Sequence, residues 1–176
     1  MKKTVQLLDY LVTQEEAVIT YHTSDMILAA RSIASYLCKP KARSRAGSHF
    51  FLSSNANITP NNGTILNIAY IIKHVMASAT EAKLAALYII ACKAVYIRII
   101  LHELGHKQPA TPLQTDNAMV DAIVNSKIQP KCTKAMNMRF HWLHDSKCQG
   151  QFIIYWRPGK HSYADYWTKH HSAKHH

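Results

Sequence analysis

The chain has 176 residues, of which 48% are apolar, and a formal net charge of +11 with its twelve histidines counted as neutral. This length suits about one domain with a continuous core, and the apolar share excludes a disordered chain. The basic balance favours a polyanionic partner such as nucleic acid, although an unspecialised basic surface fits the composition equally well. The four cysteines are widely spaced and no secretory segment is evident, which predicts reduced thiols in an intracellular protein of the cytoplasm or nucleus.

The first part of the chain predicts one helix followed by strands. Apolar and β-branched patterns predict a helix over 4–12, an extended segment over 18–24, and strands over 26–37, 49–54 and 64–75. The connections are a polar turn over 39–48 and a hairpin loop with an Asn-Gly pair over 55–63. Such tight connections predict that the three strands form an antiparallel meander.

A long apolar helix should follow the meander. Thr80 can serve as its N-cap, and Gly105 marks its end. The helix is long enough to span a bilayer, but Lys83, Lys93 and Arg98 interrupt it within one broad face. The pattern therefore favours a buried amphipathic helix and no membrane span.

The remaining chain alternates between strands and helices. We expect a strand over 111–116, helices over 117–125 and 132–147, a strand over 151–158 and a short helix over 161–170. From the first strand on, the order β-β-β-α-β-α-α-β-α predicts an α/β fold in which helices pack on a mixed β-sheet.

Three carboxylates occupy positions that suit a two-metal nuclease. Glu81 lies in the first turn of the long helix, Asp116 ends a strand, and Asp165 lies in the last helix. Magnesium prefers oxygen ligands, and two such ions can clamp the attacking and leaving oxygens of a phosphodiester. Each acid also has a structural alternative: a charge favoured by the helix dipole, a cap of the following helix, and a surface charge, respectively.

Four segments, in this order, resemble the ribonuclease H domain of Copia-type retrotransposon polyproteins: SATEAKLAAL, LQTDNAMVDAI, TKAMNMRFHWLHD and YADYWTKHH. In addition, SYLCKPKARSRAGSHFFLS resembles the first hairpin of that family, and QLLDYLV looks like the connection that follows the reverse transcriptase. The resemblance implies a ribonuclease H-like fold over 21–176 after a connection segment over 1–20. It also implies hydrolysis of the RNA strand of RNA–DNA hybrids with two Mg²⁺ ions, with Glu81, Asp116 and Asp165 as catalytic and metal-binding residues. A reverse transcriptase domain of the same polyprotein would be a further partner.

The chain departs from this family at the acid of the first strand, which matches Ile33. An isoleucine there removes a charge and places an apolar group beside the ions, so the resemblance implies weak or absent cleavage, as in a degenerate copy. A second acid of the long helix matches Lys83, which the resemblance makes a lesser change because that position is not the metal ligand. Asn137 replaces a further Asp of the family.

Basic residues on these elements are candidate contacts to phosphates, because a hybrid duplex is bound through its shape, 2′-hydroxyls and backbone. They are Lys41, Arg43, Arg45, Lys134, Arg139, Arg157 and Lys160. For the basic run over 39–45 an ordinary solvated turn fits equally well. A non-catalytic nucleic-acid-binding module is therefore one alternative function.

A second alternative is a zinc peptidase. Residues 102–106 (HELGH) match the His-Glu-x-x-His pattern, in which two imidazoles share one helical face and bind zinc. However, Gly105 and Pro109 place the motif at the end of the predicted helix, and no third histidine follows at the required spacing. This alternative is the weaker of the two.

Overall fold

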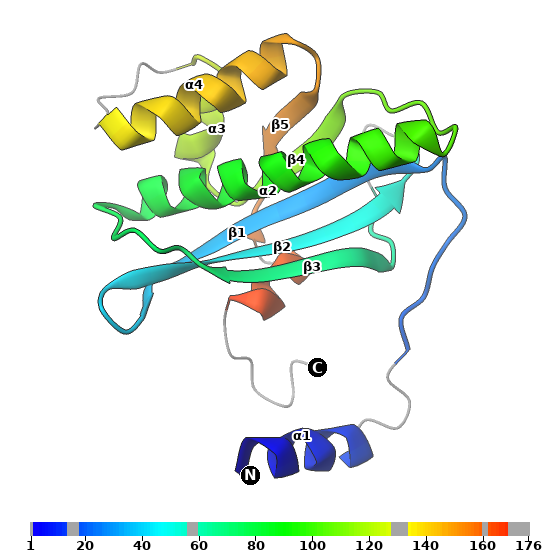
Figure 1. Cartoon of the computed structure of the whole chain (residues 1–176), viewed down its shortest axis with the longest axis vertical. Coiled ribbons are helices and arrows are strands. Elements are labelled where there is room, and N and C mark those ends of the chain that lie inside the picture. The colour runs from blue at the N-terminus through cyan, green and yellow to red at the C-terminus, as the bar shows by residue number, and fades with distance from the viewer. Residues whose placement is uncertain (1, 14–17, 56–59, 128–133, 160–161, 169–176) are drawn as a thin grey trace.

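The computed structural model describes residues 2–13, 18–55, 60–127, 134–159 and 162–168 (Figure 1). Its helices and strands follow one another in the predicted order. They are α1 (Lys2–Thr13), β1 (Ile27–Lys39), β2 (Arg43–Ser53), β3 (Thr64–Ile71), α2 (Ala79–Glu103), β4 (Thr111–Thr115), α3 (Ala118–Val124), α4 (Lys134–Cys148), β5 (Phe152–Trp156) and the 3₁₀ helix η2 (Tyr163–Trp167).

The five strands form one mixed sheet in the order β3-β2-β1-β4-β5. β1, β2 and β3 pair antiparallel as the predicted meander, whereas β4 pairs parallel with both β1 and β5. Helix α2 supplies the long crossover from β3 to β4 and lies across one face of the sheet, with α3 and α4 beside it (Figure 1). The predicted α/β class with a mixed sheet is confirmed.

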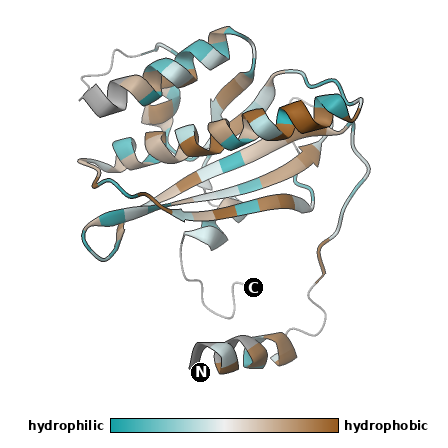
Figure 2. Cartoon of the chain, in the orientation of Figure 1, coloured by the Kyte–Doolittle hydropathy of each residue, from teal (hydrophilic) through white to brown (hydrophobic). Residues whose placement is uncertain are grey.

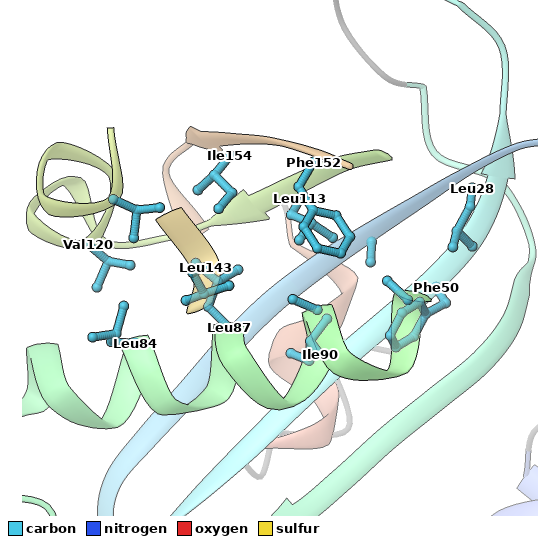
Figure 3. Packing of buried hydrophobic residues seen from close by; sticks show 14 of the residues in the cluster. Leu28, Phe50, Leu84, Leu87, Ile90, Leu113, Val120, Leu143, Phe152 and Ile154 are labelled. Carbon is cyan, nitrogen blue, oxygen red and sulfur yellow. The ribbon is translucent and has the colours of Figure 1, made fainter. Parts of the chain in front are cut away.

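The main core lies between α2 and the sheet. Leu84, Leu87 and Ile90 project from α2 toward Leu28 and Leu113 of the central strands (Figure 3). Within the described part of the chain, α2 alone is long and apolar enough to cross a membrane. Of its most apolar stretch of 18 residues, 44% is buried in the protein. Figure 2 shows apolar segments along its length. Its packing on the sheet matches the predicted buried helix.

Several boundaries differ from the predictions. The N-cap of α2 is Ser78, not Thr80: its hydroxyl accepts a hydrogen bond from the backbone N–H of Glu81 at 3.1 Å. Strand β2 begins at Arg43, which shortens the predicted polar turn to three residues, 40–42. The segment 18–24, predicted to be extended, belongs to no helix or strand. Of the predicted hairpin loop over 55–63, residues 56–59 lie outside the described part of the chain.

Candidate functional site

The candidate site lies where β4 ends beside the middle of β1. The last residue pair of these two parallel strands is Ser32 with Thr115, so Ile33 and Asp116 directly follow it. Successive strand residues point to opposite faces. Since Ala30 lies in the core under α2, Ile33 lies on the opposite face of the sheet, where η2 packs.

Ile33 occupies a tightly packed position on that face. It is 2% exposed and is paired with Gly47 of β2. A Cβ atom at Gly47 would lie 3.1 Å from Ile33 Cγ2 and 2.6 Å from Thr168 Cγ2, at the end of η2. The glycine therefore allows η2 to approach the sheet, and position 33, for which the resemblance implied an acid, holds an apolar contact.

Asp116 is paired with a lysine. Its Oδ2 accepts a hydrogen bond from Lys83 Nζ at 2.7 Å, and the side chains of Lys83 and Asp116 are 22% and 14% exposed. Oδ1 is buried and has no hydrogen-bond partner among the described residues. Asn117, not Asp116, caps α3, because its side chain accepts bonds from the backbone of Met119 and Val120. The alternative role of Asp116 as a helix cap is therefore wrong.

Glu81 is engaged at the start of its own helix. Its N–H donates to Ser78 Oγ, while its Oε2 accepts a hydrogen bond from the N–H of Ala77 at 2.7 Å. This reciprocal arrangement is close to a capping box, and Glu81 is 8% exposed. Its structural alternative, a role at the helix start, is the one that the contacts support.

The side chain of α2 that reaches Asp116 is therefore Lys83. Residues two positions apart lie about 200° apart around a helix, so Glu81 and Lys83 leave α2 in different directions. This corrects the expectation that Lys83 is a minor departure: it contributes directly to the environment of Asp116. The assignment of Glu81 as a metal ligand remains a prediction without a supporting contact.

Asp165 lies in η2 and is half-buried. Its N–H donates to Ser162 O at 3.0 Å, and its carbonyl accepts from the backbone N–H of Thr168. Among the residues that the structure describes, no three histidine, cysteine, aspartate or glutamate side chains gather to hold a metal ion. With Ile33 apolar, Glu81 in the helix cap and Asp116 paired with Lys83, the donor set does not fit a site for two magnesium ions.

The predicted phosphate contacts are distributed over several elements. The N–H of Arg157, after β5, donates to Thr115 O at 3.0 Å, and Arg139 Nη1 of α4 lies 3.8 Å from Met76 Sδ, just before α2. Arg43 and Arg45 are half-buried on β2 rather than in a turn, and Lys41 is exposed in the turn. The side chain of Lys134, at the start of α4, and the whole of Lys160 lie outside the described part of the chain.

Two buried basic groups on the η2 face matched no sequence pattern. Burial lowers the pKa of Arg31, which lies 5.5 Å from the ring centroid of Phe51; Tyr155 raises this pKa and the nearby Arg157 lowers it. Burial also lowers the pKa of His49, while its hydrogen bond to Asn62 O opposes this. His49 lines a cavity of about 1000 Å³.

The HELGH segment does not form a helical zinc motif. Helix α2 ends at Glu103, so His102 lies in its last turn and His106 lies beyond it. Between them Gly105 adopts a positive φ of 89°, which turns the chain away from the helix axis. The two imidazoles therefore do not share one helical face.

Solved structures of similar fold are ribonuclease H domains. LC11-RNase H1, isolated from compost by a metagenomic approach, matches with a TM-score of 0.60 at 10% identity over 81% of this chain and 93% of that chain. The same enzyme in complex with an RNA/DNA hybrid matches with a TM-score of 0.58 at 10% identity, covering 80% and 93% of the two chains. The foamy viral protease-reverse transcriptase in complex with dsDNA matches with a TM-score of 0.52 at 15% identity, covering 81% and 90%.

No family model and no curated protein matches the sequence. At these levels of identity the similarity concerns the fold alone. The order of strands, the crossover by α2 and the helices on the sheet agree with it. The chain therefore adopts a ribonuclease H-like fold.

Proposed function

We propose that the chain is the ribonuclease H-like domain of a Copia-type retrotransposon polyprotein, which binds RNA–DNA hybrids and cleaves their RNA strand weakly or not at all. Three observations support binding: the fold, the net charge of +11, and the similarity to an enzyme solved with an RNA/DNA hybrid. Counterion release from the phosphate backbone would supply much of the affinity.

The observation that carries the second half of the proposal is the environment of Asp116. Ile33 directly follows the strand pair that ends at Thr115, and Lys83 neutralises the one carboxylate that ends β4. Phosphodiester cleavage by this family depends on carboxylates that hold magnesium, and the residues present supply too few of them. We therefore assign magnesium-dependent cleavage to the family from which we derive the domain. The residues of this chain no longer suit a magnesium site.

We further propose how the chain is divided, which domain is its partner and where it acts. Residues 1–20 form the connection to a preceding reverse transcriptase domain, and residues 21–176 form the ribonuclease H-like domain. The reverse transcriptase is a partner within the same polyprotein. The place of action is inside the cell, in the cytoplasm or nucleus, where hybrids of an element would arise.

Binding and cleavage of a labelled RNA–DNA hybrid test the proposal. Affinity, measured by fluorescence anisotropy at several salt concentrations, should fall steeply as salt rises, because each phosphate contact releases counterions. Arg157→Ala should weaken binding to any sequence and reduce the salt slope by about one. Strong cleavage by the unmodified chain, or binding that salt does not affect, would contradict the proposal.

Substitution at the site distinguishes an impaired nuclease from the alternative, a wholly non-catalytic binding module. If Ile33 and Lys83 together prevent metal binding, Ile33→Asp combined with Lys83→Glu should raise cleavage by several orders of magnitude, because one misplaced ion removes most of the transition-state stabilisation. If the variant binds the hybrid as before and still does not cleave it, the domain is a binding module with further losses at the site.

A further inference from the structure

The ion pair between Lys83 and Asp116 places a positive charge where the fold brings α2 to the end of β4. Lys83 Nζ and Asp116 Oδ2 are 2.7 Å apart, and both side chains are largely shielded from water. Asp116 is fixed from other sides as well: its carbonyl accepts a hydrogen bond from Trp156 Nε1, and its Cβ lies 3.3 Å from where a Cβ would stand at Gly159. The ammonium and the carboxylate therefore meet in a defined place.

This ammonium changes what the site can attract. The ion pair as a whole has no net charge, so Asp116 attracts a divalent cation less strongly than an unpaired carboxylate would. A cation at Oδ1 would also lie close to the Lys83 ammonium. One oxygen of the Glu81 carboxylate, Oε2, is already engaged by the N–H of Ala77 at the helix start. An ammonium also has three N–H donors, and Asp116 takes one of them in the described contacts.

We infer that Lys83 is a tethered cation: it replaces the divalent ion beside Asp116 and contacts a phosphodiester oxygen of the bound nucleic acid, so that binding needs no metal. Asp116 then serves to position the ammonium. Further basic residues lie on neighbouring elements: Arg157 follows β5 and its backbone N–H donates to Thr115 O, and Arg139 of α4 contacts Met76 just before α2. The phosphate contact rests on the proposed binding of nucleic acid, whereas the exclusion of the metal does not.

Metal binding without nucleic acid tests the inference directly. Titration of the unmodified protein with Mn²⁺, followed by electron paramagnetic resonance, should show no saturable ion that depends on Asp116. Lys83→Glu should create one, because two carboxylates then face each other, and adding Asp116→Asn should abolish it. A stoichiometric ion on the unmodified protein that Asp116→Asn removes would overturn the inference. That measurement decides the question even if a charge-reversal variant fails to fold.

Nucleic-acid binding provides the second readout. At matched ionic strength, affinity for an RNA–DNA hybrid should change less than about twofold between EDTA and Mg²⁺, and Lys83→Gln should lower it several-fold and reduce the salt slope by about one. Lys127→Gln is the matched control, because Lys127 also pairs with a carboxylate, that of Asp121, at 2.8 Å. Affinity that collapses in EDTA, or equal losses for both variants, would overturn the inference. Absence of hybrid binding by the unmodified protein would instead refute the proposed function and leave the Mn²⁺ result standing.

Discussion

The contact between Lys83 and Asp116 should contribute measurably to stability. The two side chains are 22% and 14% exposed, so the pair lies between a surface pair and a buried one. Exposed pairs contribute about 0.2–1 kcal/mol, and breaking a buried pair costs about 3–5 kcal/mol. For this intermediate burial we expect a coupling energy of about 1–3 kcal/mol, because desolvation offsets part of the attraction.

A double-mutant cycle measures this coupling. The free energy of unfolding in urea is determined for the unmodified protein, Lys83→Met, Asp116→Asn and the double variant. Lys83→Met should be the more damaging single change, because it leaves a shielded carboxylate whose Oδ1 already has no hydrogen-bond partner among the described residues. The double variant should regain part of that loss.

A second cycle on Lys127 and Asp121 provides the comparison. These residues are 2.8 Å apart, but the Lys127 side chain is 62% exposed, so we expect a coupling below about 1 kcal/mol. If the Lys83–Asp116 coupling is no larger than this control, Lys83 is not held at Asp116, and the reasoning about a tethered cation fails with it.

Two further predictions concern the face of the sheet that carries η2. Gly47→Ala should lower the free energy of unfolding by about 1–3 kcal/mol, because the new Cβ would lie 2.6 Å from Thr168 Cγ2 and 3.1 Å from Ala164 O; an unchanged urea midpoint would contradict this packing. For His49, burial lowers the pKa of the folded state, so the unfolded chain binds the proton more readily and stability should fall as the pH drops below about 6.5. His49→Gln should make the urea midpoint fall less between pH 7 and pH 5, and an unaltered pH profile would contradict the burial of a neutral imidazole.

Sequence patterns predicted the fold well because its signals are local. Alternating apolar residues and a long apolar helix specify the meander and the crossover, and each can be recognised within a short stretch of sequence. Boundaries were less certain where two residues suit the same role. Ser78 and Thr80 are both good N-caps, and in the structure Ser78 takes this role.

The site was harder to predict because it depends on the rotation of one helix. The motif around Glu81 and Lys83 places both residues in the first turns of α2. The sequence alone does not predict which of the two side chains faces the end of β4. In the structure the packing of Ala82, Ala85 and Ala86 against the sheet fixes that rotation and directs Lys83 to Asp116. His49 could not be predicted because its burial arises from contacts with Tyr163 and Asn62, distant in sequence.

The topology also has a consequence for how the protein folds. β1 reaches β2 through a turn of three residues, but it pairs with β4 only after the chain has passed through β2, β3 and α2. Pairing of distant segments carries a larger entropic penalty and is slower. We therefore expect the meander to form early and the contact between Lys83 and Asp116, 33 residues apart, to form only when β4 docks. A local opening that releases β4 and β5 would then dissolve the site while the hairpins stay folded.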